Sequence, residues 1–317
     1  TGTLQILERE RKNPINLLTK IYGVGPKKAK ALIDDGITTI EQLKEKANEN
    51  KLNDTQKIGL KYYEPLTKRI PREEIELFKD KFDTIFKKIV SSDSDSDSLS
   101  GSKYEIVGSY RREAINSGDI DVIITNDKDN IDVFNKFLDA LISEKIVTEV
   151  LTRGKTKSLT IGELPGSIPR RIDFLYTPPD EYAFATLYFT GSKAFNTIMR
   201  QRALNMEYTL NEHGFSKMTS GKKGSKIDIA FPTEQSIFAF LGMKYKEPKE
   251  REGYKSVELL DGPPSLEVDE ISIASINKNK KVSKNKTVKM DAKVKKIVNG
   301  KKNGSKEHLA DFKENGI

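Results

Sequence analysis

Residues 108–124 combine glycines, arginines and paired aspartates in the order Gly-Ser-Tyr-Arg-Arg-Glu-Ala-Ile-Asn-Ser-Gly-Asp-Ile-Asp-Val-Ile-Ile. The apolar residues from Ile120 onward predict a buried strand. In a strand, residues two apart point to the same face, so we expect Asp119 and Asp121 to project together. Paired carboxylates repel each other unless a cation lies between them, and hard divalent ions prefer oxygen ligands. The stretch therefore predicts a metal site, although Asp-x-Asp pairs are also common where a loop enters an ordinary strand.

Two further features strengthen this interpretation. Gly108 and Ser109 allow a phosphate to approach the backbone closely and offer a hydroxyl, and the arginine pair that follows suits phosphate oxygens. Further along, residues 170–176 form another apolar, aromatic-rich strand pattern interrupted by a single acid, Asp173. Three carboxylates that hold two metal ions fit nucleotidyl transfer.

Composition excludes several other classes of protein. The chain has 317 residues, 36% of them hydrophobic and 32% charged, which suits one to three small domains. No run approaches the roughly 18 consecutive apolar residues of a spanning helix, so we expect no membrane partner. With no cysteine and only His213 and His308 as histidines, zinc sites and histidine triads are disfavoured. We expect an intracellular protein, nuclear or, if its source is viral, cytoplasmic.

Positive charge is concentrated towards the C-terminus. The net charge is +8, and residues 255–317 contain 14 lysines against nine acidic residues. This segment has few aromatic residues, so we expect a basic disordered tail whose role is either solubility or non-specific affinity for nucleic acid. Residues 91–102 form a Ser/Asp-rich loop that is too polar to be buried.

The N-terminal part contains a helix-hairpin-helix pattern. Apolar spacing flanks the turn Gly23-Val24-Gly25-Pro26, which predicts two short helices joined by a tight hairpin. Lys27 and Lys28 follow where a helix N-terminus already favours anions. The glycines of such a turn can serve only as helix caps, but the lysines favour contact with a DNA backbone, which carries no sequence information.

The remaining periodicities predict a mixture of helices and strands. Residues 37–88 are expected to be helical throughout, and the last of these helices, 72–90, has an apolar stripe that faces the core. Strands and helices then alternate, as in a mixed α/β layer. The expected strands are 104–107, 120–125, 147–151, 158–161 and 171–176, and the expected helical segments are 131–143, 182–210 and 234–243.

Five motifs, taken in order, resemble the family X DNA polymerases of the DNA polymerase beta type. They are the hairpin 23–25, Lys68-Arg69-Ile70-Pro71-Arg72-Glu73-Glu74, residues 108–121, Arg170-Arg171-Ile172-Asp173, and Leu187-Tyr188-Phe189-Thr190-Gly191-Ser192. The similarity extends from about Thr3 to Glu252. It implies an α+β fold: a nucleotidyltransferase-type palm with a mixed sheet, preceded by a helical helix-hairpin-helix subdomain and followed by a small α/β nucleotide-selecting subdomain. The implied segments are a remnant of an upstream domain or linker (1–9), the hairpin subdomain (10–70), the palm (71–178), the nucleotide-selecting subdomain (179–254) and the tail (255–317).

The resemblance also implies an activity and its site. A template-directed DNA polymerase would add dNTPs to a primer 3′-hydroxyl by two-metal catalysis and fill short gaps in base excision repair. It would be a monomer that binds dNTP and gapped or primed duplex DNA. Two Mg²⁺ ions, for which Mn²⁺ can substitute, would be held by the catalytic Asp119, Asp121 and Asp173, and Na⁺ or K⁺ by the backbone of Thr19, Ile21 and Val24. The implied nucleotide-binding residues are Arg69, Ser109, Arg112, Ser117, Gly118, Tyr188, Phe189, Gly191 and Asn196, and the implied DNA-binding residues are Gly23, Gly25, Lys27, Lys28, Arg171 and Arg200.

Two other functions remain open. A template-independent nucleotidyltransferase resembling terminal transferase would share the fold, although the short segment 154–168 leaves little room for the loop insertion that such enzymes carry. A non-catalytic DNA-binding scaffold would use the hairpin and the tail, but clustered carboxylates without a metal would cost stability. The family's N-terminal lyase domain would end near Arg9, so we expect this fragment to lack the 5′-deoxyribose-phosphate lyase activity.

Overall fold

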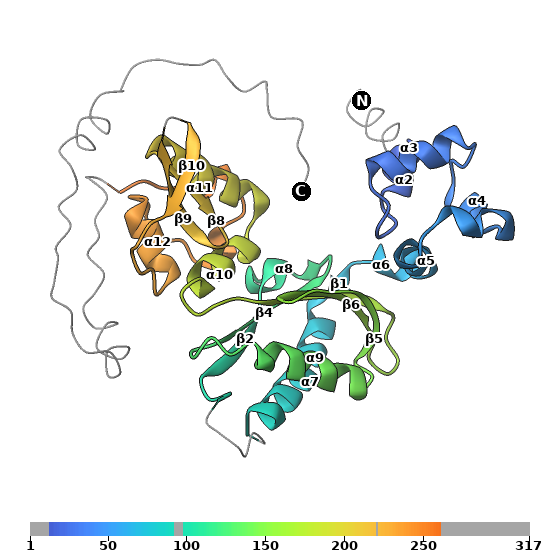
Figure 1. Cartoon of the computed structure of the whole chain (residues 1–317), viewed down its shortest axis with the longest axis horizontal. Helices are drawn as coiled ribbons and strands as arrows, with labels where there is room; N and C mark the ends of the chain where they lie inside the picture. The colour runs from blue at the N-terminus through green and yellow to red at the C-terminus, as the bar shows by residue number, and fades with distance from the viewer. Residues whose placement is uncertain (1–12, 92–97, 220, 261–317) are drawn as a thin grey trace.

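The computed structural model describes residues 13–91, 98–219 and 221–260, which form three bodies with separate hydrophobic cores (Figure 1). We call them the helical body (13–67), the sheet body (70–178) and the C-terminal body (179–260). The helical and C-terminal bodies lie at opposite ends of the sheet body (Figure 1). The expected upstream remnant, residues 92–97 of the Ser/Asp-rich loop and residues 261–317 of the tail lie outside the described residues. Among those described, no helix has the length and apolar character needed to span a membrane.

Side-chain caps mark where three helices of the helical body begin, namely those that follow Asn13, Thr39 and Asn53. The side chain of Asn13 accepts a hydrogen bond from the backbone N–H of Ile15 (3.1 Å), and Thr39 and Asn53 each form a capping box. The apolar faces meet in a small core that includes Leu18. The elements are α2 (Pro14–Leu18), α3 (Pro26–Asp34), α4 (Ile40–Lys44), the 3₁₀ helix η1 (Lys46–Lys51), α5 (Asp54–Lys61) and α6 (Tyr63–Leu66).

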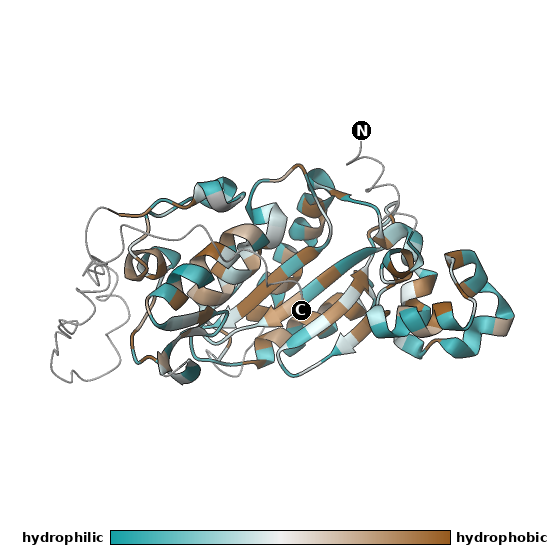
Figure 2. Cartoon of the chain, turned by 90° about the horizontal axis from the view of Figure 1, so that it is seen from above, coloured by the Kyte–Doolittle hydropathy of each residue, from teal (hydrophilic) through white to brown (hydrophobic). Residues whose placement is uncertain are grey.

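The sheet body is built on five strands in the order β2-β4-β7-β6-β5. The central neighbours β4 and β7 run parallel, and the other pairs are antiparallel. In Figure 2 these strands carry the long hydrophobic stretches of the chain, as expected for strands covered on at least one face. Their bounds are β2 (Ser102–Ile106), β4 (Ile120–Asn126), β5 (Val147–Arg153), β6 (Lys157–Gly162) and β7 (Arg170–Tyr176).

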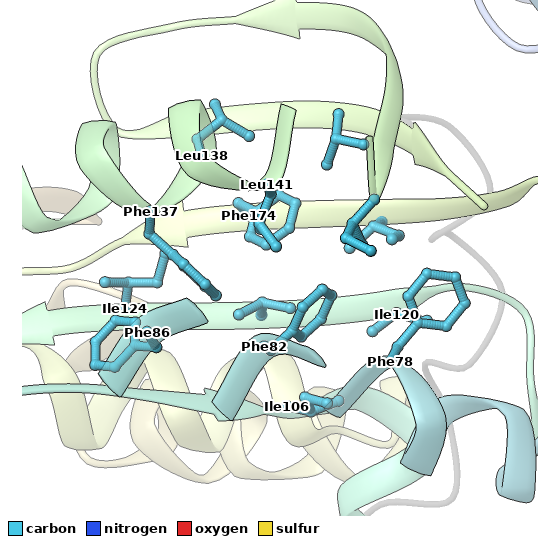
Figure 3. Close-up of a cluster of buried hydrophobic side chains, with 14 of the residues drawn as sticks. Phe78, Phe82, Phe86, Ile106, Ile120, Ile124, Phe137, Leu138, Leu141 and Phe174 are labelled. Carbon is cyan, nitrogen blue, oxygen red and sulfur yellow. The ribbon is translucent and has the colours of Figure 1, made fainter. Parts of the chain in front are cut away.

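Two helices, α7 (Arg72–Ser91) and α9 (Asp132–Ser143), cover one face of the sheet (Figures 1 and 3). Phe82 of α7 meets Phe137 of α9 and Phe174 of β7, with ring centroids 5.9 Å apart in both pairs. Each buried aromatic side chain of this kind contributes about 1.5–3 kcal/mol. Alternate residues of β7 point to the face of the sheet away from α7 and α9, and Asp173 lies on that face.

The C-terminal body packs helices against a small antiparallel sheet of order β10-β9-β8. Its core is largely aromatic: the rings of Phe215 and Phe240 lie 4.6 Å apart, and Phe231 contacts both. The elements are α10 (Tyr182–Thr190), α11 (Lys193–Asn205), β8 (Tyr208–Asn211), β9 (Gly214–Thr219), β10 (Lys222–Lys226), α12 (Glu234–Phe240) and the 3₁₀ helices η2 (Pro248–Glu250) and η3 (Tyr254–Ser256).

The expected α+β fold is confirmed, and several boundaries differ from expectation. The helical segment expected over 182–210 ends at Asn205, and β8 follows, because Tyr208–Asn211 gains backbone partners in β9 that no local pattern indicates. The region 37–88, expected to contain only helices, also contains the short strand β1 (Ile70–Pro71), which pairs with β3 (Asn116–Ser117). The helix expected over 234–243 ends at Phe240.

Candidate active site

Asp121 and Asp173 lie side by side because β4 and β7 are parallel in the register that pairs these two residues. Asp119 immediately precedes β4. One carboxylate oxygen from each of the three lies within 4.8 Å of the other two, and all three residues are half-buried. The strand pattern alone predicts that Asp119 and Asp121 share a face, and the parallel pairing adds Asp173.

The electrostatics of this cluster favour a bound cation. Burial, together with the charge of Asp173, raises the pKa of Asp121 to about 7. Burial also raises the pKa of Asp173, although Arg171 and Lys157 oppose that rise. Two carboxylates whose ionisation is this unfavourable would be stabilised by a positive charge placed between them.

Arg171 is the cation that touches the cluster in this structure. Its Nη2 pairs with Asp119 Oδ2, and its Nε lies 3.6 Å from Asp173 Oδ1. At that distance no hydrogen bond forms, so the buried Asp173 Oδ1 has no partner. An acceptor-only set of three carboxylates with an orphaned buried oxygen fits a hard divalent ion.

Gly108 is the residue that allows α8 (Gly108–Arg111) to begin against this cluster. Its φ is +64°, and a Cβ built on it would lie 2.5 Å from Asp121 Oδ2. A larger residue would therefore be strained in its backbone and would displace the carboxylate. The glycine is required here for close approach as well as for conformation.

The residues expected to bind a triphosphate line the same part of the sheet body. The hydroxyl of Ser109 donates to that of Ser117 (2.8 Å), and the Arg112 guanidinium donates to the carbonyl of Thr190 at the end of α10. The β1–β3 pairing brings Arg69 beside this group, where it donates to the side chain and backbone of Asn116 at 2.8 and 2.9 Å. Gly118 adjoins Arg69, whose Nη1 lies 3.1 Å from the position of a Cβ built on that glycine.

The residues expected to contact the sugar, base and template gather around Tyr188. Its ring lies 5.0 Å from that of Phe189, and its carbonyl accepts from Asn196 Nδ2 (2.7 Å). The Arg200 guanidinium stacks over the Tyr188 ring at 4.9 Å. Gly191 ends α10 with a φ of +71°. Arg112 connects this group to the phosphate-binding residues through Thr190.

A cleft of about 480 Å³ lies between the hairpin of the helical body and residues that adjoin the carboxylate cluster. Residues 19–25 line one wall, and Gly118 and Arg171 belong to the opposite wall. Gly23 has a φ of +80°, and its carbonyl accepts from Gln56 Nε2 (2.8 Å). Thr19, Ile21, Val24 and Gly25 lie on the hairpin wall of the cleft, and on the first turn of α3 Lys27 is exposed and Lys28 is partly exposed.

Three features of the site have no local sequence signal. Lys157, on β6, lowers the pKa of both Asp121 and Asp173, and the pairing of β6 with β7 places it near them. Arg111 bridges the sheet and C-terminal bodies by pairing with Glu234 (2.8 Å), whose other oxygen pairs with the fully buried Arg251 (2.6 Å). The helical body is also joined to β5 by Lys61, whose Nζ donates to Glu149 Oε1 (3.0 Å). Each contact joins residues far apart in the chain.

Comparison with known proteins identifies the class. Residues 16–67 match the family profile described as the fingers domain of DNA polymerase lambda, residues 69–179 the DNA polymerase beta palm, and residues 185–252 the DNA polymerase beta thumb. These are parts of a DNA polymerase. The chain belongs to family X of the DNA polymerases.

Two curated relatives give the extent of the similarity. The chain is 30% identical over 273 residues to DNA polymerase lambda of Arabidopsis thaliana, a match that covers 79% of this chain and 49% of the relative. It is 31% identical over 252 residues to DNA polymerase lambda of Rattus norvegicus, a match that covers 75% of this chain and 42% of the relative. The chain therefore spans about half the length of the curated relatives that it matches.

Proposed function

We propose that the chain is a template-directed DNA polymerase that adds dNTPs to a primer 3′-hydroxyl, with repair of short gaps as its role. The observation that carries the proposal is the register of β4 and β7, which brings Asp121 and Asp173 together next to Asp119. The substrates are gapped or primed duplex DNA and dNTP. We also propose that the protein is a monomer and is located in the nucleus. Its segments are proposed to have the boundaries expected from the sequence.

The three aspartates are proposed to hold two divalent ions, Mg²⁺ or in its place Mn²⁺. When bound, such ions lower the pKa of a primer hydroxyl and neutralise a triphosphate, so that pyrophosphate can leave. Asp119 and Asp121 would hold both ions, and Asp173 the one beside the primer. The orphaned oxygen of Asp173 makes it the proposed acceptor of the primer proton.

The remaining residues are proposed to orient the substrates. Hydroxyls and guanidinium groups around α8 would bind the triphosphate, the end of α10 would pack against the sugar, and Asn196 would contact the base edge. Since Asn196 and Arg200 already contact Tyr188, nucleotide binding would have to redirect both side chains. The proposed phosphate contacts are Arg69, Ser109, Arg112, Ser117 and Gly118, and the proposed sugar contacts are Tyr188, Phe189 and Gly191.

The hairpin is proposed to hold the primer strand. Its backbone at Thr19, Ile21 and Val24 would bind Na⁺ or K⁺ that bridges to a phosphate, and Gly23 and Gly25 would let the strand approach. Lys27 and Lys28 would add long-range attraction, and Arg171 and Arg200 would contact the DNA on the sheet and C-terminal bodies.

Single-nucleotide incorporation on a duplex with a one-nucleotide gap tests the proposal. With Mg²⁺ we expect insertion of the complementary dNTP alone, and no insertion after chelation. Asp173→Asn should abolish insertion while DNA binding is retained, because it removes one ligand and leaves the hairpin intact. Equal insertion of all four dNTPs would instead indicate a template-independent transferase, and no insertion by the parent chain would indicate a DNA-binding scaffold.

A further inference from the structure

Glu149 of β5 joins the sheet body to the helical body. Its Oε1 accepts hydrogen bonds from Lys61 Nζ (3.0 Å) and from the Tyr62 hydroxyl (3.0 Å), at the junction of α5 and α6. The Lys61 ammonium beside Glu149 holds the pKa of that carboxyl below its ordinary value. The Glu149 side chain is 29% exposed, so this contact is partly shielded from water.

A second contact from the same strand reaches the hairpin itself. Thr152, three residues after Glu149, lies close enough to the Tyr22 hydroxyl to counteract the rise in that group's pKa, and Tyr22 directly precedes Gly23. Burial, with the charge of Asp173 next in importance, raises the pKa of Tyr22, so this phenol lies within electrostatic reach of the carboxylate cluster. The hairpin is therefore held against β5 close to the catalytic aspartates.

The hairpin packs tightly on α5, so we expect the hairpin and the α5–α6 junction to move as one unit. The backbone of Tyr22 packs directly on Gly59 of α5, where a Cβ would overlap the Tyr22 carbonyl oxygen. Two residues later comes Lys61, the partner of Glu149. A contact that fixes Lys61 thus fixes the hairpin as well.

The helical body is attached to the sheet body at a second point. Arg170 donates to the carbonyls of Lys68 and Arg69 (both 3.2 Å) where the chain passes from one body to the other, and it is anchored by Glu74 (2.6 Å). Since Ile70 is held in the β1–β3 pairing, Lys68 and Arg69 form the connection about which the helical body would rotate, and such a rotation would change the width of the cleft. The Glu149 contact lies away from this junction and opposes that rotation.

We propose that Glu149 is a positioning residue that fixes the rotation of the helical body and so sets the width of the cleft between the hairpin and the carboxylate cluster. The part that concerns DNA rests on the proposed function, since a primer strand is taken to occupy this cleft. Without Glu149 the helical body samples wider and narrower openings. Only a fraction of molecules then has the width that fits the strand. The apparent affinity for DNA is the intrinsic affinity multiplied by that fraction, while the metal site is unchanged.

A distance measurement without DNA tests the positioning directly. The chain has no cysteine, so spin labels on Asp34→Cys in α3 and Lys81→Cys in α7 report one distance between the two bodies. We expect a broader distance distribution in Glu149→Ala than in the parent, and an intermediate one in Glu149→Gln, because Gln can still accept from Tyr62. The matched control is Glu64→Gln, which breaks the exposed Lys44–Glu64 pair (2.9 Å) inside the helical body and should change nothing. An unchanged distribution in Glu149→Ala would overturn the proposal.

Steady-state incorporation on gapped DNA gives the second readout. For Glu149→Ala we expect the KM for DNA to rise about 3- to 10-fold with kcat within about twofold of the parent, and Glu64→Gln to match the parent. Tighter DNA binding in Glu149→Ala would show that the contact opposes binding, and a loss confined to kcat would show that it acts on the chemistry; either result overturns the proposal. If the parent itself incorporates nothing, the proposed function fails while the distance measurement still decides the role of Glu149.

Discussion

Asp121 and Asp173 occupy the same level of two adjacent parallel strands, so their carboxylates share one half-buried site although 51 intervening residues separate them in the chain. This juxtaposition is unfavourable in the absence of a cation, because each charge is desolvated and faces the other. Binding of a cation should therefore stabilise the folded protein, and this stabilisation can be measured.

The stability of the metal-free protein should depend on the protonation of Asp121. Its pKa is raised from 3.8 to about 7, so between these values the folded protein holds a proton that the unfolded chain has released. Stability must then fall as pH rises through this window. We expect Asp121→Asn to remove the fall and to be more stable than the parent by about 1–3 kcal/mol at pH 8 in EDTA, with little difference near pH 4.

Urea unfolding at pH 4, 6 and 8 measures this difference, and added Mg²⁺ provides the control. At pH 8 the ion should stabilise the parent and leave Asp121→Asn nearly unchanged. A parent that gains stability relative to the variant as pH rises would contradict the prediction.

Arg171 should compete with metal ions for the cluster. Its guanidinium pairs with Asp119, so an ion must displace it or share the carboxylate. We expect Arg171→Met to bind Mn²⁺ about 3- to 10-fold more tightly in the absence of DNA, since a nearby positive charge is lost. Isothermal titration measures the affinity, and Lys155→Met, an exposed charge on the β5–β6 turn, is the charge-matched control. Weaker Mn²⁺ binding in Arg171→Met would mean that the arginine orders the ligands instead of competing for them.

Substitution of Gly108 should damage both stability and activity. In Gly108→Ala the new Cβ meets Asp121 and the backbone has a positive φ, so we expect a loss of roughly 2–4 kcal/mol and at least a tenfold drop in kcat. Gly166→Ala is the matched control, because Gly166 has a φ of +79° and nothing within 4 Å of the added methyl. It should cost about 1 kcal/mol and leave incorporation unchanged. Equal effects of the two substitutions would show that strain alone matters at Gly108.

The buried ion network around Glu234 should be critical for stability. Burial opposes ionisation of Glu234, but hydrogen bonds from Arg251 and Arg111 outweigh it and lower its pKa below 4.5. The stability supplied by this depression is present above pH 4.5 and is lost as pH falls through the folded-state value. We expect Arg251→Met to cost about 3–5 kcal/mol, because it leaves a buried carboxylate with one partner.

Thermal unfolding of Arg251→Met beside Arg153→Met checks this estimate. Arg153 forms an exposed pair with Asp139 (2.6 Å), so its loss should cost under about 1 kcal/mol. If the two variants lost the same stability, the buried network would contribute no more than a surface pair.

Local patterns in the sequence determined the elements that bury a regular apolar face. The stripe through Phe78, Phe82 and Phe86 predicts α7, because its period matches a helix whose one side packs on a sheet. The alternation around Asp121 predicts a strand with the carboxylate on a separate face from the core. Strand β10, in contrast, consists of exposed lysines, glycine and serine, and it exists because β9 supplies backbone partners. Such an edge strand carries no hydrophobic signal.

Only the tertiary structure decided which distant residues meet. The motif around Asp119 indicates a metal site, yet the third carboxylate, the arginine that pairs with it and the Glu149 contact depend on strand order and on how the bodies pack. Neither Lys61 nor Glu149 is distinguished from other surface charges in the sequence. The physical reason is that periodicity reports how each segment is buried, whereas long-range contacts follow from the register and packing that the whole chain reaches when it folds.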